Sequence, residues 1–451
     1  MSFFLAKALA ALDDGGDRVL FHAGGVTTTY HQARDRLRRL HAGLGGTGTV
    51  AIDLPNRPET VLVQLAALLR GATVLLVPAS APNQDRLAAA RGATVVTGRP
   101  GEWPGSDVRT LEDLDGEPEP LTLPERVSLR FPTGGTTGTP KLIHHSGIYD
   151  GMAHIFAPDP DGPRRTLLVA PMTHMTGNAT VLGALLRRDT VVLHDGFDAG
   201  AVLDAIQEHR IDTLSLTPPR LAALLDHPAR PRTDLRSVRS LSLGAAPLPP
   251  HRLAQALDVF GPVVGQGYGL TEAPMIASIS AAELLDRPDR LGSVGRIVPG
   301  MEARITGGEV EVRGLSMMDG YVGAEPIGDG WLRTGDLGRF DDEGYLYLLD
   351  RADDVVVTGE HGTKVPTTVV EHALETHPAV RSAAVFGHGR LLHAVVVTRS
   401  EVTEAELKAH AREVFGQEHY VPAGVDFVDA LPLTDVGKVD KRALAQLVTA
   451  P

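Results

Sequence analysis

Phe131-Pro-Thr-Gly-Gly-Thr-Thr-Gly-Thr-Pro-Lys141 is the stretch of this sequence that decides the fold. It places three glycines, four threonines and a closing lysine within eleven residues. Glycines let a backbone approach a ligand closely, and successive backbone N–H groups in such a loop form a nest that binds anions. Because Lys141 adds a positive charge, the stretch predicts a loop that binds a polyphosphate. Pro140 interrupts the G-x-x-x-x-G-K-[ST] pattern and so excludes a Walker A loop.

Composition narrows the class of protein. The chain has 451 residues, which predicts two or three domains, and 43% of them are hydrophobic, enough for real cores. A formal charge of −13 disfavours a nucleic-acid partner, and the absence of cysteine excludes disulfides, thiolate metal sites and a cysteine nucleophile. The apolar start lacks the basic segment of a signal peptide, and no apolar run is long enough to span a bilayer. We therefore expect a cytoplasmic protein without a membrane partner.

Short apolar strands alternate with helices through the first part of the chain. Residues 50–54 and 72–78 are predicted as buried strands, and residues 56–70 between them as a helix with Pro58 in its first turn. This alternation predicts an α/β fold with doubly wound parallel sheets. Residues 99–125, rich in glycine, proline and acids, are predicted to be a connecting loop.

A second glycine-rich motif is Gly265-Gln-Gly-Tyr-Gly-Leu-Thr-Glu272. Its glycines do not follow the G-x-G-x-x-G spacing, which excludes the dinucleotide-binding fingerprint. The motif ends in the carboxylate of Glu272. Magnesium prefers oxygen ligands and is commonly held by one or two carboxylates together with substrate phosphates. The carboxylate of Glu272 is of the residue type that such a site uses.

Both motifs resemble those of the acyl-adenylate-forming superfamily, which contains acyl- and aryl-CoA ligases, peptide-synthetase adenylation domains and firefly luciferase. By size, the chain is most similar to the small aryl and acyl acid–CoA ligases. The resemblance extends over nearly the whole chain, because further motifs follow in the family's order: the P-x-x-H-x-x-G motif at 171–177, and the segments 241–248, 292–300, 308–314, 320–321, 331–336, 350–354 and 431–444.

The resemblance implies roles for individual residues. Four would be catalytic: Lys438 at the α-phosphate, Glu272 on Mg²⁺, Thr271 on a phosphate, and His174 beside the acid. The acid pocket would be lined by His174, Asn178, Gly244 and Gly267. Tyr268 would lie on the adenine, and Asp336 and Arg351 would bind the ribose. The full set implied to bind ATP or AMP is Thr133, Gly134, Gly135, Thr136, Thr137, Gly138, Lys141, Gly244, Ala245, Ala246, Pro247, Gly267, Tyr268, Gly269, Thr271, Asp336 and Arg351.

The resemblance also implies two domains. Residues 1–352 would form the adenylation domain, including a small antiparallel, barrel-like subdomain that begins near residue 292. Residues 353–451 would form a small, mobile α+β lid domain that turns about Asp353 and carries Lys438. Lys441 and Arg442 in the final motif are predicted to be solvated surface charges.

The segment after residue 354 departs from the family pattern. Residues 357–371 are about two residues longer than the usual glycine loop and V-x-P-x-E-V-E pattern. Pro366 is displaced, and Val369 stands where an acid is common. In thioester-forming relatives this loop lines the tunnel for pantetheine, so capture of the adenylate by CoA is less firmly implied than adenylation.

The sequence therefore predicts a ligase that uses ATP and Mg²⁺ to adenylate a small aryl or short acyl carboxylic acid. The acyl group would pass to the thiol of CoA or of a carrier protein's phosphopantetheine. An amino acid is not favoured, because residues 174–178 lack the aspartate that holds an α-amino group in peptide synthetases. Two alternatives stay open: activation of a non-carboxylate anion such as nitrite for aryl amine diazotisation, and a non-catalytic nucleotide-binding relative. A monomer or homodimer is expected.

We predict that Lys438→Ala retains ATP binding and loses adenylation. A charge that acts mainly in the transition state should lower kcat more than it raises KM, on the order of 10²-fold or more. Pyrophosphate exchange with a suitable acid measures the effect, and an unchanged rate would remove Lys438 from the mechanism.

Overall fold

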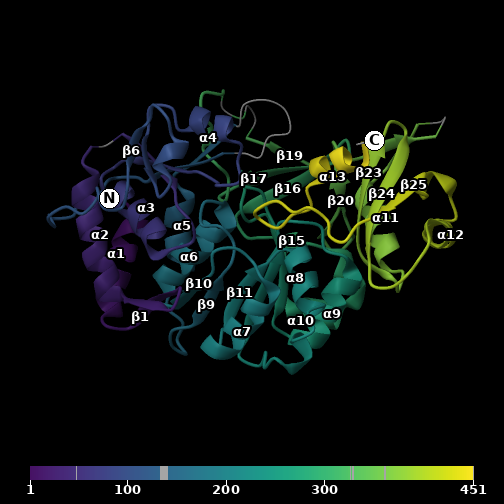
Figure 1. The fold of residues 1–451 in the computed structure, drawn as a ribbon, viewed down its shortest axis with the longest axis horizontal. Helices are drawn as coiled ribbons and strands as arrows, with labels where there is room; N and C mark the ends of the chain where they lie inside the picture. Colours follow the sequence, from purple (N-terminus) through teal and green to yellow (C-terminus); the bar gives the residue numbers. More distant parts are fainter. Residues whose placement is uncertain (47, 133–140, 326, 328–329, 360–361, 450–451) are drawn as a thin grey trace.

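The computed structural model describes residues 1–46, 48–132, 141–325, 327, 330–359 and 362–449 (Figure 1). The residues predicted to bind phosphate at 133–138 lie outside the described residues. A large body formed by the first 351 residues carries a smaller C-terminal lobe at one end. Among the described helices, none is long and apolar enough to cross a lipid bilayer.

The larger sheet of the described chain has thirteen strands. Its central strands run parallel, as the alternation of strands and helices predicted. The strand order is β16 (Met301–Thr306), β17 (Glu309–Gly314), β19 (Leu332–Phe340), β20 (Tyr345–Arg351), β15 (Gly295–Ile297), β14 (Ala277–Ile279), β13 (Val264–Tyr268), β12 (Ser240–Gly244), β11 (Thr213–Leu216), β9 (Arg165–Leu168), β10 (Thr190–Leu193), β1 (Val19–Ala23) and β2 (Val26–Thr29).

A second sheet of the described chain has seven strands. Its order is β18 (Gly320–Tyr321), β8 (Leu142–His145), β7 (Ser128–Pro132), β4 (Thr73–Leu76), β3 (Thr49–Asp53), β5 (Thr94–Thr97) and β6 (Asp107–Arg109). β7 and β8 are antiparallel neighbours, so the stretch 133–140 connects two adjacent strands. The predicted loop 99–125 contains β6 and a short 3₁₀ turn, Pro100–Glu102, which the sequence interpretation missed.

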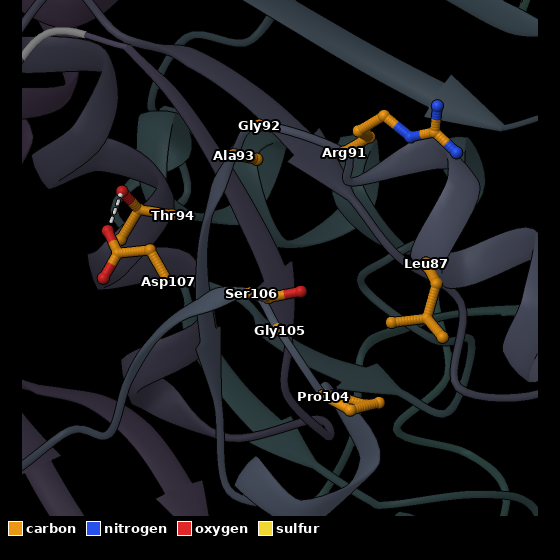
Figure 2. A pocket seen from close by; sticks show the side chains of 9 residues that line it. All are labelled: Leu87, Arg91, Gly92, Ala93, Thr94, Pro104, Gly105, Ser106 and Asp107. Atoms are coloured by element: carbon orange, nitrogen blue, oxygen red, sulfur yellow. Dashed lines mark hydrogen bonds between the residues drawn. The ribbon is translucent and has the colours of Figure 1, made fainter.

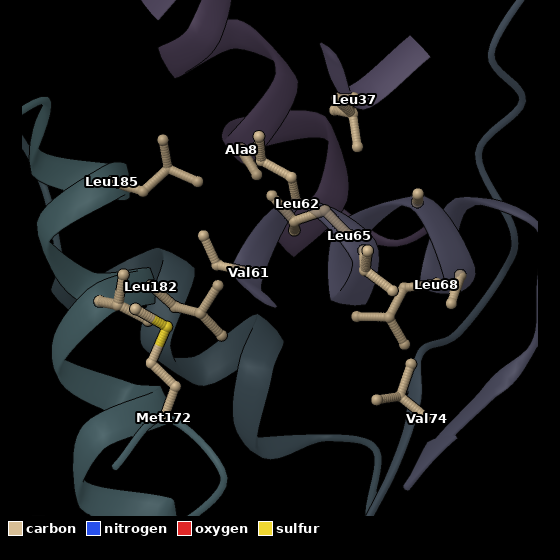
Figure 3. Close-up of a cluster of buried hydrophobic side chains, with 14 of the residues drawn as sticks. Ala8, Leu37, Val61, Leu62, Leu65, Leu68, Val74, Met172, Leu182 and Leu185 are labelled. Atoms are coloured by element: carbon tan, nitrogen blue, oxygen red, sulfur yellow. The ribbon is translucent and has the colours of Figure 1, made fainter. Parts of the chain in front are cut away.

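Helices α1 (Phe3–Gly15), α2 (Tyr30–Leu44), α3 (Pro58–Leu69), α5 (Ile148–Ile155) and α6 (Met175–Arg187) build the largest core. α3 begins at Pro58, as predicted, because proline has no N–H to lose at the first helical position. Leu62 and Leu65 are at most 2% exposed and pack with side chains of α1 and α6 (Figure 3). Burial of each such leucine contributes about 1.5–3 kcal/mol. α3 is therefore a largely apolar helix within this core.

The remaining helices of the body are α4 (Asn83–Ala89), α7 (Ala199–His209), α8 (Pro218–Leu225), α9 (Pro250–Phe260) and α10 (Ala281–Asp286). The second large core gathers side chains of α7 to α10 and of the parallel strands of the thirteen-stranded sheet. Sites in parallel sheets commonly form at the carboxyl ends of the strands, which for β12 and β13 lie at Gly244 and Tyr268.

The antiparallel strands predicted after residue 292 are present, but they are not a separate barrel. β14, β15, β16, β17, β19 and β20 are hydrogen-bonded in series to the larger sheet, and β18 joins the other sheet beside β8. Period-2 patterning identifies strands but not their neighbours, which explains the difference.

The C-terminal lobe has its own three-stranded sheet and its own apolar core. Its elements are β21 (Val356–Thr358), β22 (Thr363–Val365), α11 (Thr367–Glu375), β23 (Val380–His388), β24 (Leu391–Thr398), α12 (Glu404–Phe415), β25 (Gly424–Phe427) and α13 (Lys441–Thr449). The boundary at 352/353 and the mobility of this lobe remain predictions.

Lys441 is not the solvated charge that was predicted. Its ammonium lies 2.9 Å from the carboxylate of Glu371 and donates to the hydroxyl of Thr367 at 2.8 Å. The prediction failed because α13 packs Lys441 against α11, which the sequence pattern did not indicate. The side chain of Arg442 lies outside the described structure.

Asp350, the last residue but one of β20, caps helix α11 from outside the lobe. Its carboxylate accepts hydrogen bonds from the backbone N–H and the hydroxyl of Thr367, and from the backbone N–H and the hydroxyl of Thr368. These groups satisfy helix N-terminal donors that would otherwise need water. A cap of this kind stabilises a helix by about 0.5–2 kcal/mol.

We predict that Glu375→Gln stabilises the lobe at pH 8 and not at pH 4.5. Burial raises the pKa of Glu375 to about 7, against the opposing hydrogen bond from the N–H of Ala383. The pKa of Glu375 is higher in the folded protein than in the unfolded chain. The lobe therefore loses stability as the pH rises from the unfolded pKa through about 7. Glutamine keeps the acceptor and does not titrate, so we expect a gain of about 1–3 kcal/mol at pH 8.

Thermal unfolding of the two proteins at both pH values measures this difference. Glu401→Gln, at an exposed position, is the matched control. An equal shift at pH 4.5 and pH 8 would mean that the carboxylate charge is not the cause.

Candidate active site

The site is built at the carboxyl ends of two neighbouring parallel strands. Gly244 at the end of β12 pairs with Gly267 in β13. A Cβ atom on Gly244 would lie 2.6 Å from the carbonyl oxygen of Gly267, and one on Gly269 would lie 2.2 Å from that of Pro274. Gly244 and Gly269 must therefore be glycine, because the backbone is closely packed along this surface at the strand ends.

The loop that follows β12 is strained. Ala245 has φ +68°, in the left-handed region that non-glycine residues enter at a cost of roughly 1–2 kcal/mol. Ala245 and Pro247 are exposed and Ala246 is partly exposed at the strand end. Strain of this kind is commonly stored at ligand sites, where the surrounding structure holds the backbone in one conformation.

Asp336 is the centre of a buried hydrogen-bond network beside this surface. It is 8% exposed, and its Oδ2 accepts a hydrogen bond of 2.6 Å from the hydroxyl of Tyr268. Its Oδ1 accepts one of 3.0 Å from Arg351, which is its partner in the β19–β20 ladder. Burial and the charge of Asp336 raise the pKa of the Tyr268 phenol, which keeps it a donor. The three predicted nucleotide-binding residues thus form one connected unit.

Lys438 reaches this unit from the C-terminal lobe. Lys438 is exposed. The crowding of protein around it lowers the pKa of its ammonium, and so does the charge of Arg351, whereas Asp336 and Glu272 oppose the shift. The structure therefore brings Lys438 within electrostatic range of three other predicted site residues.

Glu272 lies at the end of the β13 motif, next to Tyr321 of β18. The Tyr321 hydroxyl donates to Oε1 of Glu272 at 3.0 Å, and the Lys141 ammonium lies 5.0 Å from the centre of the Tyr321 ring. Burial, and then the charge of Glu272, raise the pKa of the Tyr321 phenol. Within the described residues there is no cluster of three metal-binding side chains. The carboxylate of Glu272 is a hard oxygen ligand, and its hydrogen-bond partner Tyr321 stays neutral. Glu272 therefore suits a Mg²⁺ ion that also binds substrate oxygens.

Thr271 precedes Glu272 and is fixed by its backbone. Nε2 of His145 donates to the Thr271 carbonyl at 2.7 Å, and burial lowers the pKa of that histidine so that it stays neutral. This contact fixes the orientation of the backbone at Thr271. The Thr271 hydroxyl is then available to a ligand.

His174 and Asn178, both predicted to line the acid pocket, have different surroundings. His174 is partly exposed, and its Nε2 lies 2.8 Å from Oδ2 of Asp435. Asn178 has no exposed surface, and its amide bonds with Gln64, Tyr149 and Met172 inside the core. These contacts give Asn178 a packing role in place of the predicted pocket role. In sequence it lies one helical turn after His174, a spacing that does not reveal burial.

Two hollows flank the body. One lies beside Lys141 and Tyr321, near the end of the predicted phosphate loop. The other lies at the opposite edge of the seven-stranded sheet, where Thr94 donates to Asp107 at 2.9 Å (Figure 2). The second hollow contains none of the predicted site residues and has no role in the proposed chemistry.

Family models match most of the chain. The model described as AMP-binding enzyme matches residues 10–322, and the model of the AMP-binding enzyme C-terminal domain matches residues 369–438. The chain belongs to the AMP-binding enzyme family. The predicted superfamily and the predicted α/β fold class are confirmed.

Relatives of this family cover nearly the full length of both chains. The 2-succinylbenzoate–CoA ligase of Bacillus velezensis is 32% identical, over 93% of this chain and 92% of its own. The feruloyl-CoA synthase of an Amycolatopsis species is 32% identical, over 93% of each chain.

Two solved structures of the AMP-binding enzyme fold are also similar. The amide bond synthetase McbA from Marinactinospora thermotolerans has a TM-score of 0.85 and 30% identity, covering 99% of this chain and 100% of its own. The o-succinylbenzoate CoA synthetase of Bacillus subtilis, solved with ATP and a magnesium ion, has a TM-score of 0.84 and 27% identity, covering 97% and 99%.

Sequence reasoning missed two contacts of this family member's site. Tyr321, quoted only as part of a motif, is the hydrogen-bond donor to Glu272. Asp435, three residues before Lys438, is the partner of His174 across 261 residues of sequence. An acid so close to the predicted catalytic lysine was the available signal for the second contact.

We predict that Glu272→Gln raises the Mg²⁺ concentration needed for AMP formation while the fold stays intact. Glutamine keeps the shape and the hydrogen bond from Tyr321 but removes the charge that a hard cation requires. Glu302→Gln, an exposed carboxylate of β16, is the matched control. Equal Mg²⁺ dependence in both variants and in the parent would make Glu272 a structural residue.

Proposed function

We propose that this protein is an AMP-forming acid–thiol ligase that uses ATP and Mg²⁺. It activates a small aryl or acyl carboxylic acid, releases pyrophosphate and passes the acyl group to CoA. The observation that carries the proposal is the connected unit of Tyr268, Asp336 and Arg351 beside the ends of β12 and β13. The charges of Asp336 and Arg351 act on the Lys438 ammonium of the C-terminal lobe. Members of the family named as CoA ligases support it. We place the protein in the cytoplasm as a monomer or homodimer.

The first step is an in-line displacement at phosphorus. A carboxylate oxygen of the acid forms a bond to the α-phosphorus, and the bond from that phosphorus to the bridging oxygen breaks. Pyrophosphate leaves with the electron pair, and no proton has to move. The protein must position the groups and neutralise developing charge, which is how phosphoryl-transfer sites work.

Each residue of the site has a defined part in this step. The Lys438 ammonium balances negative charge that develops at the α-phosphate. Asp336, fixed by Tyr268 and Arg351, presents a carboxylate acceptor suited to ribose hydroxyls. Glu272 would hold Mg²⁺, which would supply additional positive charge to the departing phosphates. In the second step the acceptor thiolate forms a bond to the acyl carbon, and AMP leaves.

An aromatic acid is the best-supported substrate class. The relatives named above act on 2-succinylbenzoate and on the acid of feruloyl-CoA, both aromatic. The nitrite and non-catalytic alternatives gain no support from these relatives.

The acceptor has a second candidate. The similar structure of an amide bond synthetase covers the whole length of both chains, so an amine could replace the thiol. The segment after the predicted hinge also supports an amine as acceptor. β21 and β22 form a hairpin there, whereas the family pattern is shorter at this place. A carrier-protein thiol is the third possible acceptor.

Pyrophosphate exchange with a panel of acids tests the proposal. The panel contains 2-succinylbenzoate, ferulate, benzoate, hexanoate, alanine and nitrite. We expect exchange with at least one aromatic acid and none with alanine. Adding CoA, or a primary amine, to the active acid then identifies the acceptor. Failure of every acid, with ATP still bound, would favour the non-catalytic alternative.

We predict that Asp353→Pro keeps the first half-reaction and loses the second. Asp353 lies in the turn between β20 and β21, and proline locks φ near −65° there. A ligase that needs two orientations of the lobe should still exchange pyrophosphate yet form no acyl-CoA.

An amine-using enzyme that needs one orientation should retain full turnover in this variant. Product formation by Asp353→Pro, compared with its own pyrophosphate exchange, distinguishes the two. Loss of both activities in a folded protein would contradict the assigned hinge.

A further inference from the structure

The loop that carries Lys438 is a tight hairpin that leaves the C-terminal lobe and reaches over the body (Figure 1). Leu433 and Val439 pair across it as an antiparallel bridge. Thr434 closes the turn: its N–H donates to the Lys438 carbonyl at 2.8 Å, and its hydroxyl accepts from the Lys438 N–H at 3.2 Å. Since the turn fixes Lys438 relative to the hairpin, whatever holds the hairpin tip also directs this side chain.

Asp435 is the first residue of that tip, and side chains of the body hold it. Its Oδ2 lies 2.8 Å from Nε2 of His174, the residue that precedes α6, and it accepts a hydrogen bond from the hydroxyl of Ser80. Burial opposes ionisation of Asp435, but the hydrogen bond and charge of His174, with Ser80, lower its pKa to about 2. The carboxylate is therefore ionised at neutral pH, and hydrogen bonds to an ion are roughly twice as strong as neutral ones.

The backbone of the tip fits a socket formed by α8. Arg220 donates to the carbonyl of Asp435 at 2.6 Å, and Thr217 donates to the carbonyl of Gly437 at 3.0 Å. Gly437 has φ +80°, and a Cβ atom there would lie 2.6 Å from Nε of Arg220 and 2.8 Å from Oγ1 of Thr217. The tip therefore packs so closely against Thr217 and Arg220 that only glycine fits at position 437.

A second, independent contact joins the lobe to the body. Asp226 at the end of α8 accepts two hydrogen bonds of 2.9 Å from Arg252 and lies 3.2 Å from Arg399 of the lobe. Arg252 also donates to the Arg381 carbonyl of the lobe at 3.0 Å. The lobe thus has an anchor that does not involve the hairpin, so loss of the tip contact alone would misdirect Lys438 without releasing the lobe.

We propose that Asp435 is the positioning residue for Lys438: its pairing with His174 holds the hairpin tip in the body during adenylation and must separate before the acceptor attacks. The proposal rests on the proposed function, since it assigns a role within its first half-reaction. It also links the acid side of the site to the lysine, because His174 is the residue predicted to border the acid. Asp435 acts on the chemistry only through Lys438 in this proposal.

Asp435→Ala tests the proposal against Asp426→Ala. Asp426 makes a His–Asp pair of 2.7 Å with His393 inside the lobe, so this control removes the same chemistry without touching the body. We expect kcat for pyrophosphate exchange to fall on the order of 10- to 100-fold in Asp435→Ala, with KM for ATP changed by no more than about threefold. Formation of thioester from chemically prepared acyl-adenylate and CoA should be retained or faster. Asp426→Ala should behave as the parent in both assays.

Equal loss of both half-reactions in Asp435→Ala would indicate a merely structural residue and overturn the proposal, as would an unchanged exchange rate.

A pair of cysteines supplies a rescue test, since the chain contains no other cysteine. In Ser80→Cys/Asp435→Cys the reduced protein lacks the ion pair and should exchange pyrophosphate slowly. A short linker that reacts with both thiols would hold the hairpin tip against the body by covalent bonds. We expect exchange to recover and acyl transfer to CoA to stop, whereas single-cysteine variants treated alike should not respond. No recovery on linking would contradict the proposal.

Hydrogen exchange separates this proposal from the proposed function, because it needs no substrate. Amides of residues 431–440 should exchange faster in Asp435→Ala than in the parent and in Asp426→Ala. If the tip amides exchange faster in Asp435→Ala but the parent activates no acid, the positioning contact is supported and the proposed ligase activity is contradicted. Unchanged protection of the tip would remove the positioning role, whatever the enzyme activity.

Discussion

The carboxylate of Asp336 is the interaction on which the geometry of the site depends. It accepts from Tyr268 of the central sheet and from Arg351 at the end of β20, so one buried group fixes residues from three sequence motifs. An ionised carboxylate that is 8% exposed is costly unless it is paired, and here both oxygens are occupied. These hydrogen bonds orient the three side chains relative to one another, and such preorganisation is what electrostatic stabilisation of a transition state requires.

Local patterns in the sequence predicted the parts of the site that depend on the backbone. The glycines at 244 and 269 allow close approach of neighbouring chains, and Pro58 starts its helix because of its ring. Spacing and residue type encode such features directly. The same local rules identified the antiparallel strands after residue 292 but gave no information about which sheet they join.

Contacts between distant side chains were the part that the sequence could not supply. Asn178 and His174 are four residues apart, yet one bonds inside the core and the other meets the C-terminal lobe. Lys441 similarly pairs with Glu371 only because α13 packs beside α11. Burial of a polar side chain depends on which element covers it, and no period in the sequence records that.

The cap that Asp350 places on α11 has a consequence for the timing of turnover. Thr367 and Thr368, its partners, belong to the segment that departs from the family pattern. Asp350 lies before the predicted hinge and α11 after it, so a rotation of the lobe about Asp353 would break the cap on the first turn of that helix. Rotation of the lobe and fraying of α11 would then be one equilibrium. In a ligase whose lobe rotates, the two threonines that bind this cap would set part of the rate of the catalytic cycle, and substitution at these positions would change that rate.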